Sequence, residues 1–239
     1  MQLGTGPAPL PPGGDLAAAL AVRARDLGHR PAVTVLRAGG VRAEQGYASL
    51  AQWAAKGAHL LDLEQGLGPG DRVGVDGPAD WMAAAVALAA WWAGCTVVVE
   101  GDAEVVVRHA SRAGGRVHAD EVYAWDDTVD GATDPTLPGT EAWAVAVQAF
   151  PDQPPAPRAA PDVVAVTSGD ASRTHADLVA QLAPAVPATA GALRLHDATD
   201  PLAALLAVAA RPVVVGRATV VLDGVDDEAA AGEGRLTWL

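Results

Sequence analysis

Residues 81–99 read WMAAAVALAAWWAGCTVVV, and this stretch decides the fold. Its first part is apolar on every side and suits a helix, whereas the β-branched residues after Gly94 suit a strand. A run this long raises the question of a membrane span, which needs about 20 apolar residues. Asp80 and Glu100 flank the run, and Gly94 interrupts it. The stretch therefore predicts a buried helix that turns into a buried parallel strand.

The segments around this stretch alternate between helix and strand. Asp15 is placed to cap a first helix, and the S-x-x-Q sequence at residues 49–52 predicts a capping box. Residues 103–113 suit either a strand or a helix. The elements expected in this half are a helix at 16–27, two strands around a Gly-Gly turn in 31–48, a helix from 49 to about 63, a strand at 72–75, a helix at 79–93, and strands at 96–99 and 105–107.

The second half of the chain follows a loop-rich segment, residues 125–161. This segment has a short helix near 141–149 and ends in the proline-rich PDQPPAPRAAP, which predicts a stiff connector and a lobe boundary. The elements expected beyond it are a strand at 163–167, a helix from 174, a strand at 193–195, a helix at 200–210 with Asp200 as its cap and Pro201 at its first position, strands at 212–216 and 218–222, and a closing RLTWL segment.

Strands that alternate with helices predict an α/β fold. The sheet is expected to be mostly parallel, with helices covering both of its faces. The expected division of the chain is a flexible leader at 1–14, an α/β lobe at 15–161 that ends in the proline-rich connector, and a second α/β segment at 162–239 packed on the first.

The composition excludes several classes of partner. The formal net charge of −13 repels nucleic acid and anionic lipid, so neither is an expected partner. The N-terminus, MQLGTGPAPLPPGG, lacks the basic and apolar regions of a signal peptide, so a cytoplasmic location is expected. The lone Cys95 predicts a buried thiol, and the tryptophans predict core anchors, except that Trp125, beside an acidic loop, is expected to be an exposed contact.

From residue 30 to residue 99 the chain resembles the opening of the acyl-adenylate-forming superfamily, which includes acyl-CoA synthetases and adenylation domains. The shared features are a tyrosine and a leucine before a helix, the turn GLGPGDRV, and a Trp-containing apolar helix that ends at Ala93-Gly94. TSG at 167–169 stands where that family has its phosphate loop, and Thr174-His175 stand where the loop leads into a helix. The resemblance covers nearly the whole chain but at most the first half of a full-length enzyme. The high Ala and Arg usage suits a shortened actinobacterial relative.

The loop itself departs from the family pattern, S-G-[ST]-T-G-x-P-K-G. Glycines there let backbone N–H groups approach phosphate oxygens, and the lysine neutralises charge. The second glycine, the proline and the lysine are missing, and Asp170 adds a carboxylate that repels a phosphate charge about 4 Å away by roughly 4 kcal/mol at an effective dielectric of 20. The residues of this relic phosphate loop are Thr167, Ser168, Gly169, Asp170, Ser172, Arg173, Thr174 and His175.

The low lysine content also argues against a working phosphate loop. Lys56 is the one lysine of the chain, and it lies on a helix far upstream of the loop. The resemblance implies a further catalytic lysine from a small C-terminal domain, an aromatic-Gly-x-Thr-Glu segment and a ribose-binding aspartate, and none of these is found. The expectation is therefore a non-catalytic binding or scaffold protein with no cofactor, in which ATP or AMP binding is disfavoured.

Two alternatives to this expectation stay open. One is an AMP-binding or acyl/CoA-binding enzyme whose site is completed by a homodimer or a partner chain. The other is a purely structural partner of a full-length synthetase or of another cytoplasmic enzyme. A protein partner or homodimer is expected in each case, because a lobe without its usual covering leaves apolar surface for another chain. A small-molecule ligand also stays open.

Other candidate sites have little support in the sequence. Ser168, His175 and Asp177 could form a hydrolytic triad, but no G-x-S-x-G sequence accompanies them. The sequence THAD at 174–177 is instead explained as the start of a helix that Thr174 caps, by accepting from the backbone N–H near Asp177. The histidines show no H-x-x-x-H spacing and no Cys pair exists, so no metal site is expected. A solvated loop is the expected role of the acidic residues Asp126, Asp127, Asp130 and Asp134, which lack the other features of a calcium loop.

Overall fold

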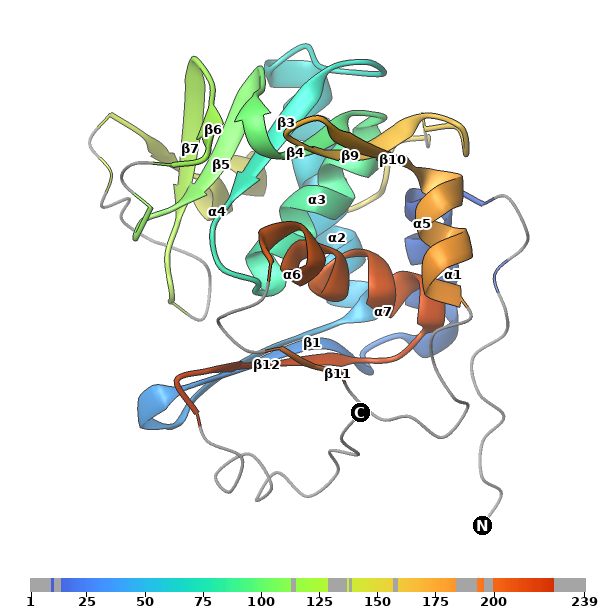
Figure 1. Ribbon diagram of the computed structural model, residues 1–239, viewed down its shortest axis with the longest axis vertical. Helices are drawn as coiled ribbons and strands as arrows, with labels where there is room; N and C mark the ends of the chain where they lie inside the picture. Colours follow the sequence, from blue (N-terminus) through green and yellow to red (C-terminus); the bar gives the residue numbers. More distant parts are fainter. Residues whose placement is uncertain are drawn as a thin grey trace.

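Helix α3 (Trp81–Ala93) lies between two β-sheets and is buried along its whole length (Figure 1). Because apolar layers cover it from both sides, the helix needs no polar face, and this explains its uniformly apolar sequence. Gly94 ends it in the left-handed conformation, with φ of 88°. The structure is a computed structural model, which describes residues 10, 14–112, 115–128, 137, 139–156, 159–183, 193–195 and 200–225.

The larger sheet has eight strands and is mostly parallel. Its order is β10-β9-β4-β3-β5-β7-β8, with β6 paired to β4, and only the β9–β10 pair is antiparallel. Its strands are β3 (Arg72–Asp76), β4 (Thr96–Asp102), β5 (Val105–His109), β6 (Val117–His118), β7 (Glu121–Trp125), β8 (Glu141–Ala142), β9 (Val164–Ser168) and β10 (Ala171–Thr174).

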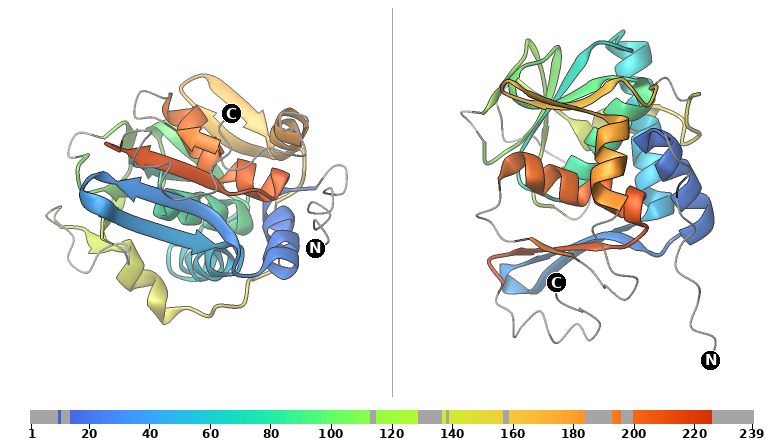
Figure 2. Two further views of the ribbon diagram at one scale, coloured as in Figure 1. Left: turned by 90° about the horizontal axis from the view of Figure 1, so that it is seen from below. Right: turned by 45° about the vertical axis from the view of Figure 1, so that its right-hand side comes forward.

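The smaller sheet has four strands in the order β11-β12-β1-β2 and forms the opposite layer (Figure 2). β1 runs parallel to β12 and antiparallel to β2. Val33, Val35 and Val221 belong to the main core, whereas Leu36 and Val220 form a second cluster with Leu222, as the period of two along a strand requires. Its strands are β1 (Pro31–Arg37), β2 (Val41–Gly46), β11 (Leu193–Leu195) and β12 (Thr219–Asp223).

Helices fill the space between the two sheets (Figures 1 and 2). α2 crosses α3 closely because Gly57 has no side chain; a Cβ there would lie 2.8 Å from Ala89 and 2.8 Å from the Trp143 ring. The remaining helices are α1 (Leu16–Leu27), α2 (Tyr47–His59), α4 (Trp143–Ala146), α5 (His175–Leu182), α6 (Pro201–Val208) and α7 (Ala210–Val215). None of the helices in the described ranges is long and apolar enough to cross a membrane.

The mixed α/β class with a mostly parallel sheet flanked by helices is confirmed. Asp15 caps α1 by accepting a hydrogen bond from the Ala18 amide, and Asp200 caps α6 in the same way. Residues 105–109, which suited a strand or a helix, form a strand. The RLTWL segment lies outside the described residues. The lobe boundary stays a prediction.

Three local predictions are wrong. The capping box at 49–52 is not formed, because α2 already begins at Tyr47, whose hydroxyl donates to the buried carbonyl of Pro212. The PVVVG segment is helical in α7, because burial of Val213 and Val214 outweighs their preference for strands. Trp125 is fully buried and not an exposed contact. The strands β6, β7, β8 and β10 were not predicted.

Asp80 holds the layers together at the start of α3. Its carboxylate is buried and accepts hydrogen bonds from the Ala83 amide at 2.7 Å and the Trp125 indole at 3.0 Å. The Arg37 guanidinium, on β1 of the smaller sheet, lies 3.6 Å from the same carboxylate. Burial raises the pKa of Asp80 above its ordinary value, while these three partners oppose the shift.

We expect Asp80→Ala to lower the free energy of unfolding by about 3 to 5 kcal/mol, because it leaves the buried Ala83 amide and Trp125 indole without an acceptor and removes one of the carboxylates that face Arg37. Urea unfolding measures this loss. The control is Asp26→Ala, because Asp26 forms its ion pair with the exposed Arg25; this variant should cost at most about 0.5 kcal/mol. Equal costs for the two variants would contradict the role given to Asp80.

Candidate functional site

The relic phosphate loop is a tight hairpin. Thr167 and Ser168 end β9, Gly169 and Asp170 make the turn, and β10 returns beside β9 with Ala171 opposite Ser168. Gly169 has φ of 54°, a conformation that favours glycine. The segment is therefore a structural turn between two paired strands, and its backbone follows β9 and does not open around a ligand.

The backbone amides at this site are bonded to the protein itself. The Gly169 amide donates to the carbonyl of Glu100 at 3.3 Å. At the start of α5, the His175 amide donates to the Val163 carbonyl at 3.1 Å and the Ala176 amide to the Pro161 carbonyl at 2.8 Å. A helix N-terminus binds phosphate through amides that have no partner, and these amides have partners.

Thr174 starts α5 through a reciprocal capping box. Its hydroxyl accepts from the Asp177 amide at 3.1 Å, and its own amide donates to the Asp177 carboxylate at 3.0 Å. These hydrogen bonds lower the pKa of Asp177 below its ordinary value. Arg173 turns away from the hairpin tip and donates to Gln181 on α5. The predicted cap is confirmed.

His175 is fully buried under α1. Its Nδ1 accepts from the Leu16 amide at 3.3 Å, so the ring proton is on Nε2, and its ring meets Trp91 edge-on. Desolvation lowers the pKa of His175 from 6.5 to about 4. Because Asp177 is engaged in the capping box, Ser168, His175 and Asp177 do not form the hydrolytic triad that the sequence left open.

Lys56 is engaged elsewhere. Its ammonium donates to the Phe150 carbonyl at 2.9 Å and pairs with Asp152 at 2.8 Å. It fastens the segment after the 3-10 turn Val147–Ala149 to α2. The one lysine of the chain is thus a structural contact.

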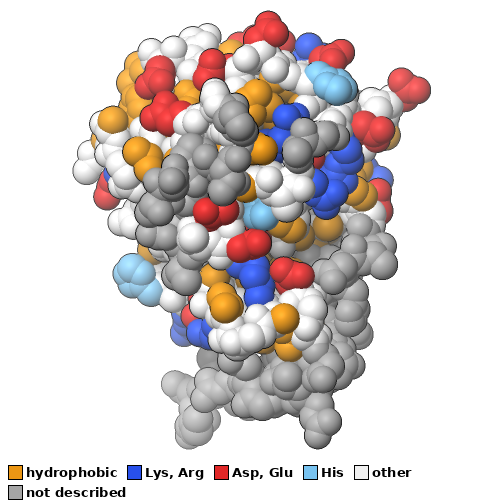
Figure 3. Space-filling model, turned by 90° about the vertical axis from the view of Figure 1, so that its left-hand side faces the viewer, with side chains coloured by type: hydrophobic (Ala, Val, Ile, Leu, Met, Phe, Trp, Pro, Cys, Tyr) orange, Lys and Arg blue, Asp and Glu red, His pale blue; other side chains and the backbone are white. Residues whose placement is uncertain are grey.

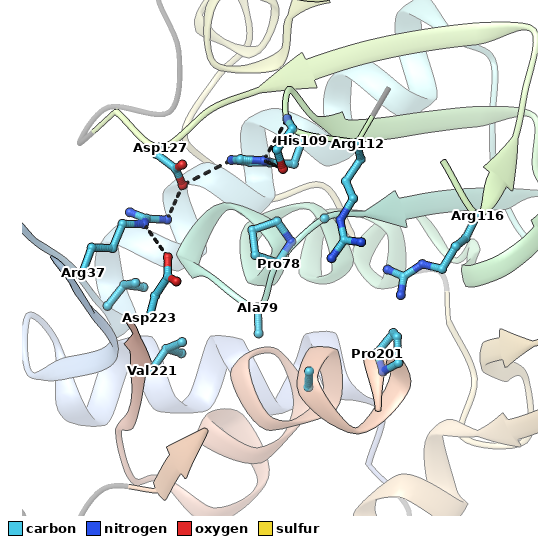
Figure 4. Close-up of a pocket in the computed structure, with 14 residues that line it drawn as sticks. Arg37, Pro78, Ala79, His109, Arg112, Arg116, Asp127, Pro201, Val221 and Asp223 are labelled. Carbon is cyan, nitrogen blue, oxygen red and sulfur yellow. Dashed lines mark hydrogen bonds and ion pairs between the residues drawn. The ribbon is translucent and has the colours of Figure 1, made fainter. Parts of the chain in front are cut away.

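A cavity of about 310 Å³ opens between the two sheets, at the ends of β3 and β5 (Figure 4). This position, beyond the carboxyl ends of parallel strands, is where α/β proteins bind ligands. None of the relic-loop residues lines it. The lining residues are Val35, Arg37, Gly77, Pro78, Ala79, His109, Ser111, Arg112, Arg116, Asp127, Pro201, Ala204, Val221 and Asp223.

One end of the cavity is an ion-pair network around Arg37. The guanidinium lies 2.9 Å from Asp127 and 3.4 Å from Asp223, and Asp127 also lies 3.3 Å from Nε2 of His109. We call Arg37, Asp127 and Asp223 the aspartate end. In the face that Figure 3 shows, acidic side chains lie across the middle, and Lys and Arg side chains gather toward the upper right.

This cavity was not predicted from the sequence. Its lining comes from segments that are far apart in the chain: β1, the β3–α3 turn, the end of β5 and the connection after it, the segment after β7, α6 and β12. The one local signal was the recurrence of arginine at 108, 112 and 116, at the end of β5 and just beyond it. Within the described residues, no group of three or more His, Cys, Asp or Glu side chains could hold a metal ion. Asp130 and Asp134 fall outside those residues.

Solved structures with the same fold are acyl-CoA synthetases and ligases. The acyl-CoA synthetase of Brucella canis superposes with a TM-score of 0.68 at 18% identity, over 90% of this chain and 44% of its own. A mutant form of coronafacic acid ligase from Pectobacterium brasiliense gives 0.65 at 13% identity, over 92% and 48%. The anthranilate CoA ligase AuaEII, solved with anthranoyl-AMP, gives 0.62 at 14% identity, over 94% and 48%. The chain has the fold of part of these enzymes and spans less than half of their length.

One curated relative matches a shorter segment. A "TIGR03089 family protein" of Mycobacterium tuberculosis is 39% identical over 74 residues, which is 30% of this chain and 30% of that protein. No protein-family model matches the chain. The comparisons therefore establish the fold, and the activity has to be argued from the site.

We expect Thr174→Ala to lower the free energy of unfolding by about 0.5 to 2 kcal/mol, because it removes the hydroxyl of the capping box. Chemical denaturation measures the change. Thr174→Ser keeps the hydroxyl and should stay close to the wild type. A loss of stability in the serine variant as large as in the alanine variant would contradict the capping role.

The buried His175 predicts a pH dependence of stability. Because its folded pKa of about 4 lies below 6.5, the unfolded chain binds the proton first, and stability falls as the pH drops from 6.5 to 4. The full shift corresponds to about 3 kcal/mol. Urea unfolding at several pH values should show this loss in the wild type and a shallower slope in His175→Gln. Parallel slopes for the two proteins would contradict the assignment.

Proposed function

We propose that the protein is a non-catalytic binding or scaffold protein, built on the fold of part of an acyl-CoA synthetase and without a working adenylation site. The observation that carries this proposal is the occupancy of the amides at Gly169, His175 and Ala176 by protein carbonyls. Phosphate binding there would require breaking hydrogen bonds that hold β9, β10 and α5 in place. Phosphate binding at this loop would therefore lower the stability of the folded protein.

Electrostatics at the hairpin supports the same proposal. Asp170 is exposed at the turn, where its charge opposes a phosphate group. The nearby Arg173 is bonded to Gln181, and Lys56 is fastened to Asp152. Neither Arg173 nor Lys56 is therefore placed to neutralise the charge of a transferred phosphoryl group. An acyl-adenylate such as the one bound by AuaEII would lack its usual charge partners at this loop.

A partner chain and a cytoplasmic location are part of the proposal. β2 lies at one edge of the smaller sheet and exposes Val41 to the extent of 42%. Leu63 and Val145 are also exposed, at 68% and 52%. An open edge strand and exposed apolar side chains are features that a second copy or another protein would cover. The net charge of −13 keeps nucleic acid outside the proposed set of partners.

ATP–pyrophosphate exchange tests the absence of adenylation. The 239-residue chain, incubated with Mg-ATP, labelled pyrophosphate and a panel of carboxylic acids, should give no exchange above the protein-free background. Ser168→Ala should give the same result, because the wild-type loop does no chemistry. Exchange by the wild type that Ser168→Ala abolishes would overturn the proposal.

The variant Asp170→Gly sharpens this test. It removes the repelling carboxylate and relaxes the turn, yet the amides of Gly169, His175 and Ala176 keep their partners. We therefore expect no gain in ATP affinity by calorimetry. A variant that binds ATP at the loop would show that Asp170 alone closed a working site.

A further inference from the structure

The end of the cavity opposite the aspartate end carries an excess of positive charge. Asp76 is fully buried and is the one carboxylate in contact with both Arg108, at 3.1 Å, and Arg116, at 3.7 Å. The side chain of Arg112 has no hydrogen-bond or ion-pair partner among the described residues. Three guanidinium groups against one carboxylate leave two positive charges in this region of a chain whose net charge is −13. We call Arg112 and Arg116 the arginine end.

The backbone holds both arginines in place. The Arg112 amide donates to the His109 carbonyl at 2.8 Å, and the Arg116 amide donates to the Asp76 carboxylate at 3.0 Å. Gly115 lets the chain pass against Asp76, since a Cβ there would overlap the carboxylate. Both guanidinium groups lie on the same side of the cavity, above Pro201 (Figure 4). The backbone positions of the arginine end are thus fixed by hydrogen bonds within the protein.

Arg116 also has unused hydrogen-bonding capacity. Its Nε is buried and makes no hydrogen bond within the described part of the chain. A buried donor without a partner costs free energy that a ligand oxygen or an ordered water would recover. Arg112 and Arg116 both lie on the connection between β5 and β6. Two guanidinium groups together offer more N–H donors than one planar carboxylate accepts, which suits a tetrahedral group with several oxygens.

We propose that the arginine end binds the phosphoryl group of a small phosphorylated molecule. A phosphomonoester carries a charge close to −2 at neutral pH, which matches the two uncompensated positive charges. Pro78, Ala79 and Pro201 form an apolar wall beside it for the organic part of the ligand. The volume of about 310 Å³ is at the lower limit for small-molecule sites, so the ligand is small.

The aspartate end determines the orientation in which the ligand binds. Asp127 and Asp223 repel an anion there, so the phosphoryl group is favoured at Arg112 and Arg116. The N-terminus of α6 adds no anion site of its own, because Asp200 already occupies its Ala203 amide at 2.9 Å. The ligand site is therefore defined by the two arginines and the apolar wall.

Calorimetric titration with phenyl phosphate, inorganic phosphate and benzoate tests this site. We expect phenyl phosphate to bind more tightly than inorganic phosphate, because only the ester contacts the apolar wall, and more tightly than benzoate, because the carboxylate has a single charge. Arg112→Gln should weaken phenyl phosphate binding by at least about tenfold. Arg112 is exposed and has no partner, so this variant should keep its fold, as thermal unfolding will show.

Two comparison variants make the result specific. Arg25→Gln removes the same charge from an arginine on α1 whose side chain is 74% exposed, and it should leave the affinity within about twofold. Arg112→Lys keeps the charge but loses the planar fork, and its affinity should fall between those of the wild type and Arg112→Gln. No binding of phenyl phosphate, equal binding in Arg112→Gln, or tighter binding of benzoate or inorganic phosphate would each overturn the assignment.

This site rests on the proposed binding role, but the two can fail separately. Pyrophosphate exchange depends on the hairpin of β9 and β10, whereas phenyl phosphate reports on the arginine end. Any weak binding of ATP should be lost in Arg112→Gln and kept in Ser168→Ala if it occurs in the cavity. The opposite pattern would leave the arginine end without support and would point to the hairpin.

Discussion

The carboxylate of Asp80 touches the helical layer and both sheets. It caps α3, binds the indole of Trp125 on β7 and faces Arg37 on β1. The interior between the two sheets is largely apolar, and non-directional burial by itself fixes no register between layers. A buried carboxylate needs all of its partners, so this contact selects one arrangement of the layers. The same Arg37 continues to Asp127 and Asp223 and so forms one wall of the cavity.

The hairpin has the position expected of a ligand site, whereas the cavity has the physical properties of one. The hairpin lies where the family resemblance places phosphate binding, yet its amides serve β9 and α5. The cavity has open volume, an apolar wall and uncompensated arginines, although the sequence resemblance assigned it no role. A fold can host unrelated functions at different sites, and the physical properties of each site decide which of them binds. In this chain those properties favour the cavity.

The sequence predicted what local chemistry controls. The uniformly apolar residues 81–93 required a helix buried on all sides, and Asp15, Thr174 and Asp200 were recognisable as caps. Tertiary contacts decided the errors: the Tyr47 hydroxyl is anchored at Pro212, and packing turns the β-branched 212–216 segment into helix. The cavity could not be predicted from the sequence, because its charged residues come together only in the folded chain. They include Arg37, Asp127 and Asp223.

The amides that would cradle a phosphate at the hairpin donate to acceptors within the protein. Nuclear magnetic resonance of the amide signals of Gly169, His175, Ala176 and Asp177, recorded with and without excess Mg-ATP, tests these hydrogen bonds residue by residue. The account predicts that these signals stay at their positions while ATP is added. Saturable movement of these four signals, with disappearance of the effect in Ser168→Ala, would show a working phosphate loop and contradict the account.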